Sequence, residues 1–471
     1  MKAISQSFKL YLFVALVATG SALLALGLES FLGSFILIRG LAVLSSIVFL
    51  LGSMFVSLFR FEWGLAMFFA ILPVFVRLEA GFPFTIGFVT ITPETLFIVV
   101  FLFIWFLKAA RENKPFLTKT NLDLPIFLLV LSGFISLTNS VEPVESIQAF
   151  IAGFIQPIAL YYIIVNNIKS VKQLKPILYA ILIGFLIASS YSLYLFLNQG
   201  YDIRMGYTFG NPNRHAFYVV VMLPYLIALL SLPKKKYKGI INIFLSVIIL
   251  LVILSQIMTA SRGGILIMGF IIMAFFYNRH YRLLVMKFVP IFIVLIAIGF
   301  SLKGELLQSK FGFFAKRFAV EGLYNASRLD IWEGSIAMIR DHPLVGIGLN
   351  MFRKIFPRYM IPNPRYLLPE GLTLSAHNSF LQAWIELGLL GILAFVGILT
   401  FSLRDAMRAY RYSNNASLKV LSFASLIALV SVIIDSIASP LPVYVGPSFI
   451  LTCPIMFWSL LGFIQVLRRM K

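Results

Sequence analysis

Charged residues are scarce in this chain, making up 12% of its 471 residues, whereas 60% are hydrophobic. Soluble globular domains carry about 25% charged residues, so the composition excludes a soluble enzyme. The single cysteine, Cys453, excludes a disulfide framework and a cysteine zinc site. The four histidines have no metal-ligand spacing, and Asp-x-Asp, P-loop and Gly-x-Ser-x-Gly motifs are absent. We therefore expect neither a cofactor nor a metal.

Basic residues, in contrast, are in excess, and the formal net charge is +21. Such an excess can indicate a nucleic-acid partner. Here the basic residues flank apolar spans, as the topology of a membrane protein requires. We therefore expect membrane lipid around the protein and no nucleic acid.

Long apolar runs predict an all-α, polytopic bundle of membrane helices, because each spanning helix needs about 20 apolar residues. The candidate spans are 10–28, 41–59, 63–77, 94–107, 122–139, 148–165, 174–197, 215–231, 240–259, 263–277, 283–301, 378–401, 418–437 and 449–466. Two of them are short, so we expect about 12 to 14 helices. The first run is long enough to span, and we interpret it as an uncleaved helix.

Basic clusters set the expected orientation. They lie at 108–119, 169–175, 234–238, 279–287, 404–419 and 468–471. An even number of spans separates each cluster from the next, so all lie on one side, which the positive-inside rule makes cytoplasmic. We expect a bacterial inner-membrane protein with both termini in the cytoplasm.

One outward loop, 302–377, is long and too polar to insert, and loops of that length are usually functional. Within it, residues 327–339 favour a helix that Ser327 would cap. The expected organisation is N-terminal helices (1–200), helices with arginine-bearing hairpins (201–301), this periplasmic loop subdomain (302–377) and C-terminal helices (378–471).

Two outward hairpins carry arginines beside helix-breaking residues. In the first, Arg204 and Arg214 flank a Gly-Asn-Pro-Asn run that contains Asn211. Backbone amides left free there, next to arginine, would bind an anion, although an ordinary connecting hairpin explains the pattern equally simply. In the second, Arg262 precedes two glycines at a helix start, which suits a phosphate. The alternative is an interfacial arginine that extends toward water.

The third outward segment begins where the long loop re-enters the membrane. His377 stands near a helix N-terminus, which disfavours imidazolium and keeps a neutral base available. Glu386 lies two and a half turns further, on the opposite face, so it cannot contact His377 directly. A carboxylate at that depth is either functional or paired with a group on a neighbouring helix. Gly388 and Gly391 would allow close helix packing.

The long loop itself adds Arg328 and a Gly-Ile-Gly run that follows His342. This run is not a dinucleotide fingerprint, because no strand precedes it and no third glycine follows in place. We interpret it as a turn, and His342 as structural. The outer face thus offers arginines and one well-placed histidine, a set suited to transfer from an anionic leaving group.

In this order, the motifs resemble those of the O-antigen ligase/polymerase superfamily. The matching residues are Arg204, the Gly210–Asn213 run, Ser261–Gly263, Arg328, Trp332, the His342–Gly348 run, the His377–Leu381 run, and the Glu386–Gly391 run. The resemblance covers residues 201–395, and it implies a metal-independent, inverting glycosyltransferase of the GT-C type. Such enzymes take a glycan from undecaprenyl diphosphate on the periplasmic face.

By the same resemblance, Arg204 and Arg262 would hold the diphosphate and His377 would be the general base. Arg214, Asn211, Arg328, Asn378 and Glu386 would bind substrate or support the site.

The superfamily includes ligases that load lipid A core, repeat-unit polymerases that extend a growing glycan, and protein O-oligosaccharyltransferases. One large loop that ends at His377 favours a ligase. A lipid-linked glycan transporter or flippase is the non-enzymatic alternative. It would need polar groups through the membrane, whereas here they gather on one side.

Overall fold

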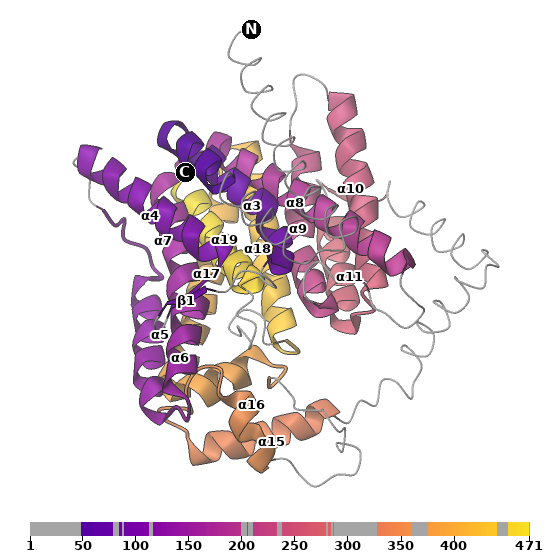
Figure 1. The fold of residues 1–471 in the computed structure, drawn as a ribbon. Coiled ribbons are helices and arrows are strands. Elements are labelled where there is room, and N and C mark those ends of the chain that lie inside the picture. Colours follow the sequence, from indigo (N-terminus) through magenta and orange to yellow (C-terminus); the bar gives the residue numbers. More distant parts are fainter. Residues whose placement is uncertain are drawn as a thin grey trace, which may run out of the picture.

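We analysed a computed structural model. It describes residues 49–78, 84–86, 89–112, 116–198, 205, 211–232, 238–278, 281–283, 286, 327–359, 375–439 and 451–470. This part of the chain is almost entirely helical (Figure 1). A single hairpin of two antiparallel strands, β1 (Phe84–Ile86) and β2 (Val89–Ile91), connects α3 to α4. The predicted all-α class is confirmed, with this hairpin as a small addition.

The helices follow the apolar runs of the sequence. In chain order they are α3 (Phe61–Leu78), α4 (Pro93–Glu112), α5 (Asp123–Ser136), η2 (Leu137–Asn139), α6 (Pro143–Phe150), η3 (Ile151–Ile155), α7 (Gln156–Asn167), α8 (Val171–Asn198), α9 (Pro212–Ser231), α10 (Lys238–Met258), α11 (Arg262–Tyr277), α15 (Ser327–Asp341), α16 (Phe352–Ile355), η5 (Phe356–Tyr359), α17 (Ser379–Arg411), α18 (Ala416–Ser436) and α19 (Thr452–Arg469).

Six helical segments of the described chain are long and apolar enough to cross a membrane. They are Pro93–Glu112, Pro143–Asn167, Val171–Leu195, Pro212–Ser231, Ser379–Arg411 and Ala416–Ser436. Shorter apolar helices accompany them, which confirms a polytopic membrane protein. Of the predicted spans, 10–28 lies outside the described residues and 283–301 lies almost entirely outside them.

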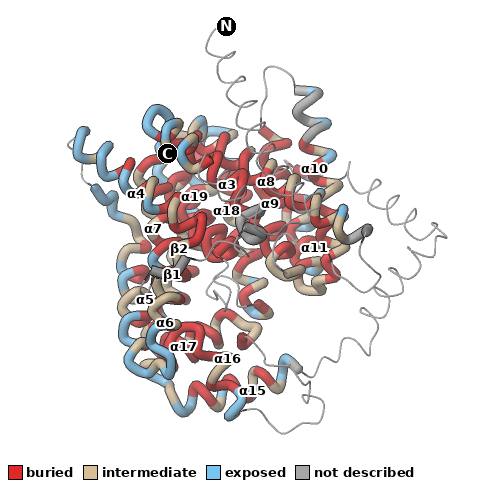
Figure 2. The backbone as a smooth tube through the Cα atoms, viewed as in Figure 1, coloured by how far each residue is buried: buried red, intermediate tan, exposed pale blue. Residues whose placement is uncertain are grey.

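The burial pattern separates the centre of the bundle from its lipid-facing surface. Helix α9 is buried along nearly its whole length and packs against α10, α11 and α18. Figure 2 shows buried residues through the middle of the molecule, whereas much of α4 and α5 is exposed. On α5 the exposed side chains include Leu124, Phe127 and Phe134. Large apolar side chains on an outer helix are the surface that lipid covers.

Segments that carry three of the basic clusters meet at one end of the bundle. Arg469 donates hydrogen bonds to the backbone oxygens of Lys119 (2.9 Å) and Val165 (3.2 Å). Arg468 pairs with the buried Asp405 at 3.2 Å. These contacts gather the chain before α5 with the ends of α7, α17 and α19, in agreement with the even spacing of these clusters.

The loop subdomain lies at the opposite end. Helices α15 and α16 stand far from the C terminus (Figure 1). Apolar side chains of α15, α16 and the start of α17 form a small second core there. Arg353 and Lys354 fasten this subdomain to α6 through Glu145 (2.8 Å) and Glu142 (3.3 Å), respectively. The predicted helix at 327–339 is confirmed as α15.

Helix α17 contains a break at Gly388, whose φ of 69° is left-handed. A Cβ there would lie 2.1 Å from the carbonyl oxygen of Leu344. The break lets the loop that follows α15 pack on α17: the amides of Ile347 and Gly348 donate to the oxygens of Ile385 (2.9 Å) and Glu386 (3.2 Å). The prediction that Gly388 serves packing between helices is therefore wrong. The residue ends one helical segment and admits a loop.

Candidate functional site

The site is built around the turn that starts α17. His377 has a left-handed φ of 51°, an uncommon conformation for a residue with a side chain. Asn378 follows it and caps the helix, because its side-chain oxygen accepts the amides of Phe380 (2.8 Å) and Leu381 (3.0 Å). The position of the imidazole is therefore set by the helix start.

The residue before His377 is held equally firmly. The backbone amide of Ala376 donates to the side-chain oxygen of Gln382 at 2.8 Å. Its carbonyl oxygen accepts Nε1 of Trp332 at 3.1 Å, which ties the turn to α15. With both flanking residues fixed, the backbone of His377 is held in its left-handed conformation.

Arg328, in the first turn of α15, connects the charged groups of the site. It interacts electrostatically with Asp435 of α18 and Arg262 of α11, and its charge acts on His377. Partial desolvation lowers the pKa of Arg328, Asp435 raises it, and Arg262 lowers it again. The residue is nevertheless exposed at the surface, so its guanidinium is available to a ligand.

Arg262 opens α11 immediately after a tight turn. Ala260 in that turn has a left-handed φ of 49°. Gly264 follows in the first helical turn, and a Cβ there would lie 2.8 Å from Cβ of Ala216 in α9. The starts of α9 and α11 are therefore adjacent. Nε of Arg262 is buried and has no hydrogen-bond partner within the described chain, which leaves a strong donor unused.

Asp435 is the acidic member of the site, at the end of α18. Its carboxylate hydrogen-bonds to Ser439 and interacts with Arg328. Ser379, the first residue of α17, donates to the backbone oxygen of Ser439 at 2.6 Å, which brings the end of α18 to the start of α17. The sequence marks Asp435 only as an ionisable residue within an apolar run. Its role became visible only when the fold placed it beside Arg328.

Burial lowers the pKa of His377 to about 4, and the positive charge of Arg328 lowers it further in the same direction. The imidazole is therefore neutral throughout the physiological pH range and can accept a proton. This is the state that the sequence predicts for His377.

Of the other predicted site residues, one lies outside the described chain and two stand at the start of α9. Arg204 lies outside the described residues. Arg214 stands in the first turn of α9 and, like Asp435, lies near Cys453 of α19. Asn211 caps α9 by accepting the amide of Arg214 at 2.9 Å. Like Asn378, it therefore supports a helix start.

Glu386 lies apart from these groups. It is buried within α17, and its Oε1 accepts the amide of Phe352, the first residue of α16, at 3.4 Å. It therefore anchors the loop subdomain, because its partner is the first amide of α16 and not a group on a neighbouring membrane helix. His342 follows the C-terminal end of α15, about 20 Å along that helix from Arg328.

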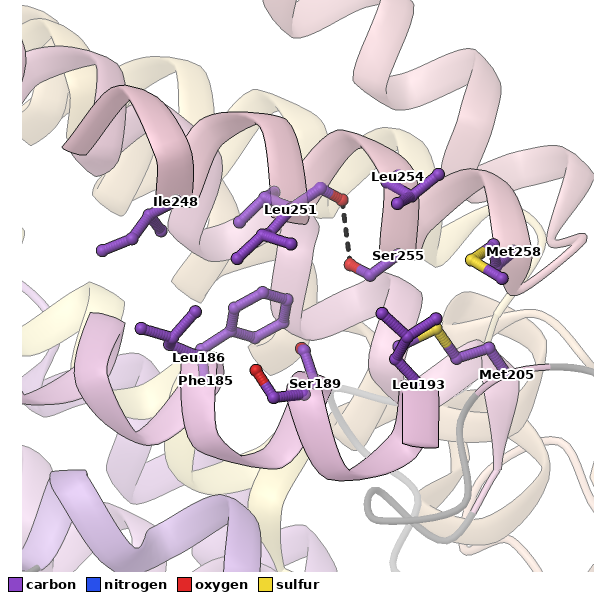
Figure 3. A pocket seen from close by; sticks show the side chains of 12 residues that line it. Phe185, Leu186, Ser189, Leu193, Met205, Ile248, Leu251, Leu254, Ser255 and Met258 are labelled. Carbon is purple, nitrogen blue, oxygen red and sulfur yellow. Dashed lines mark hydrogen bonds between the residues drawn. The ribbon is translucent and has the colours of Figure 1, made fainter. Parts of the chain in front are cut away.

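A small cavity of about 20 Å³, lined mostly by apolar side chains, lies between α8 and α10 (Figure 3). Phe185, Leu193 and Leu251 are among the side chains that line it. At its end, the amide of Met205 donates to the backbone oxygen of Met258 at 3.1 Å, four residues before Arg262. The cavity is large enough for about one water molecule and lies close to the turn that precedes Arg262.

Four helices begin at this site: α9, α11, α15 and α17. Each N-terminus contributes a partial positive charge of about half a unit. Arg214, Arg262 and Arg328 add full positive charges near three of these N-termini. The arrangement can bind a multiply charged anion beside a neutral imidazole.

Residues 245–396 match the family model described as O-antigen ligase. Over these residues the chain is similar to O-antigen ligases. The match runs from α10 to the first part of α17 and includes Arg262, Arg328 and His377. The predicted resemblance to the O-antigen ligase/polymerase superfamily is confirmed.

A protein from Haemophilus influenzae, described as uncharacterised, is 26% identical to this chain over 257 residues. The aligned part is 48% of this chain and 58% of that protein. The chain thus spans little more than half the length of the relative that it matches.

Proposed function

We propose that this O-antigen ligase family protein is a glycosyltransferase that moves a glycan from undecaprenyl diphosphate to an acceptor hydroxyl. Within that class, we propose an O-antigen or surface-polysaccharide ligase whose acceptor is lipid A core. The observation that carries the proposal is that Arg328 stands near enough to both His377 and Arg262 for its charge to act on each of them. His377 is the candidate base, Arg328 and Arg262 are the candidate anion-binding groups, and each residue stands at the start of a different helix.

In the proposed reaction, the arginines bind the diphosphate and stabilise the charge that develops on it as the bond to the sugar breaks. His377 accepts the proton of the acceptor hydroxyl, whose oxygen attacks the anomeric carbon from the opposite face. The anomeric C–O bond to the diphosphate breaks, a new C–O bond forms with inversion, and undecaprenyl diphosphate leaves. In this reaction the guanidinium groups supply the positive charge that a divalent metal ion supplies in metal-dependent enzymes.

One further feature supports the proposed orientation of the site. The polar groups of the site stand at the end of the bundle opposite the basic clusters. By the positive-inside rule, this supports a periplasmic site and cytoplasmic termini in a bacterial inner membrane.

The proposal is tested with purified full-length protein, undecaprenyl diphosphate-linked glycan, and lipid A core added or left out. A ligase transfers glycan only when core is present. Chain lengthening without core would make the protein a polymerase instead. Movement of the lipid-linked glycan across a liposome membrane, without bond formation, would contradict enzymatic function altogether.

Variants connect the activity to the site. We expect Arg262→Ala and His377→Ala to abolish transfer while the protein still accumulates in the membrane. Arg340→Ala is the matched control, because Arg340 is an exposed arginine near the other end of α15. Normal transfer by either site variant would refute the assignment of that residue.

A further inference from the structure

A second polar cleft lies at the other end of the bundle, where α17 and α19 end and α18 begins. Its volume is about 290 Å³, close to the lower end of small-molecule sites, which span roughly 300–1,000 Å³. The residues that line it include Arg408, Tyr412, Ser413, Leu418, Leu467 and Arg468. One wall of the cleft is therefore cationic and another is apolar.

This cleft is separate from the site around His377. The part of α17 that follows the break at Gly388 runs to Arg411 and is itself about 35 Å long. Arg408 stands in its last turn. The two sites therefore lie at opposite ends of the bundle, and a ligand in one cannot reach the other.

The charge of the cleft is positive and largely uncompensated. Arg408 is exposed, and no carboxylate among the described residues forms an ion pair with it. Arg468 pairs with Asp405 at 3.2 Å. That buried carboxylate also accepts hydrogen bonds from Asn121 (3.0 Å) and Gln465 (2.9 Å). Asp405 thus fixes Arg468 in place and leaves Arg408 to an external anion.

Other charged groups near the cleft also contribute to its net charge. Arg404, Arg411 and Arg469 lie on the last turns of α17 and α19, and Lys419 lies in the first turns of α18. The start of α18 contributes a partial positive charge, whereas the ends of α17 and α19 contribute partial negative charges. Full guanidinium charges outweigh these partial ones.

We propose that this cleft binds the headgroup of an anionic phospholipid. The phosphate would lie between Arg408 and Arg468, and the acyl chains would leave along Leu418 and Leu467. Tyr412, 61% exposed, is the residue type that favours the membrane–water interface. The apolar wall favours a lipid over a soluble phosphate, and basic pockets between membrane helices on the cytoplasmic side are typical sites for anionic lipids. The inference does not depend on the reaction proposed above.

The test measures lipid retained by the purified full chain in native mass spectrometry, together with its thermal stability. The probes are phosphatidylglycerol, phosphatidylcholine and inorganic pyrophosphate, each added alone. We expect the protein to retain phosphatidylglycerol, to gain thermal stability from it, and to discriminate against phosphatidylcholine. Equal retention of the two lipids would overturn the proposal. Stabilisation by pyrophosphate but not by phosphatidylglycerol would replace it with a soluble anion.

Arg408→Gln and Arg411→Gln form the matched pair of variants. Both arginines are exposed in the last turn of α17, but only Arg408 lines the cleft. We expect Arg408→Gln to weaken retention of phosphatidylglycerol about fivefold, the factor that corresponds to about 1 kcal/mol per basic residue. Arg411→Gln should change it by less than about twofold, because its charge acts through solvent. Equal effects of the two substitutions would show general surface attraction and would overturn the assigned cleft.

Discussion

The charge of Arg328 should be measurable as a change in the protonation of His377. Burial and Arg328 both lower the pKa of His377 from 6.5 to about 4, and burial is the larger cause. Replacing Arg328 with Gln removes only the smaller contribution. Less than half of the difference should therefore be recovered, which places the new pKa between about 4 and about 5.3.

Acylation by diethyl pyrocarbonate measures this directly, because the reagent attacks only neutral imidazole. The rate at His377 is followed by peptide mass spectrometry between pH 4 and 8, in the full chain and without substrate. In the wild type the rate should fall with a midpoint near pH 4, and in Arg328→Gln the midpoint should rise by up to about 1.3 pH units. The readout needs no enzymatic activity, so loss of substrate binding does not obscure it.

Arg340→Gln serves as the control, because this exposed arginine is about three turns further along α15. Its midpoint should equal that of the wild type. If Arg328→Gln leaves the midpoint unchanged, Arg328 does not act on His377, and the connection between base and anion-binding groups is refuted. An equal rise in both variants would show a general effect of protein charge.

Three further predictions concern the architecture around the site. Gly388→Ala should destabilise the protein by more than about 2 kcal/mol. A left-handed residue with a Cβ costs roughly 1–2 kcal/mol, and the new Cβ would also stand 2.1 Å from a backbone oxygen. The control in thermal unfolding is Gly397→Ala, whose nearest neighbour to the new Cβ lies at 3.4 Å and which should stay close to the wild type. Gln382→Ala removes the side chain that accepts the Ala376 amide next to His377. Because the general base is then held less firmly, kcat should fall about tenfold or more with KM nearly unchanged. A change in KM alone would contradict a positioning role. The pKa of His377 is about 4 in the folded protein and 6.5 in the unfolded chain, so the unfolded chain binds more protons between these pH values. The free energy of unfolding should therefore fall as pH drops from 6.5 to about 4. His377→Gln should lose that part of the pH dependence, and an unchanged profile would refute the assignment to His377.

Hydrophobic run length and basic clusters predicted most of the fold, because both follow from the demands of the bilayer. The contacts of Arg469 with Lys119 and Val165 agree with the predicted grouping of basic clusters at one end. The break at Gly388 could not be predicted. A glycine in a membrane helix is consistent with close packing, and only the approach of Leu344 distinguishes the two roles.

The site was predictable where the residue type restricts the chemistry. Arg262 and His377 stand at helix starts, and a helix start beside arginine or histidine suggests its function from local sequence. The parts of Asp435 and Arg328 depend on how the fold brings charges of α15, α11 and α18 near one another, and these helices are far apart in the chain. Asn211 and Asn378 suggested substrate contacts, whereas their side chains cap helices. Capping and ligand binding use the same oxygen, so sequence alone does not separate them.

The central claim is that separate residues bind the diphosphate and activate the acceptor. The most direct test compares donor binding and single-turnover transfer in purified His377→Gln and Arg262→Gln proteins. We predict that His377→Gln binds undecaprenyl diphosphate-linked glycan within about twofold of the wild type but transfers it at least about 100-fold more slowly, the effect of losing a general base. Arg262→Gln should lose donor affinity. Transfer by His377→Gln at the wild-type rate would contradict the account.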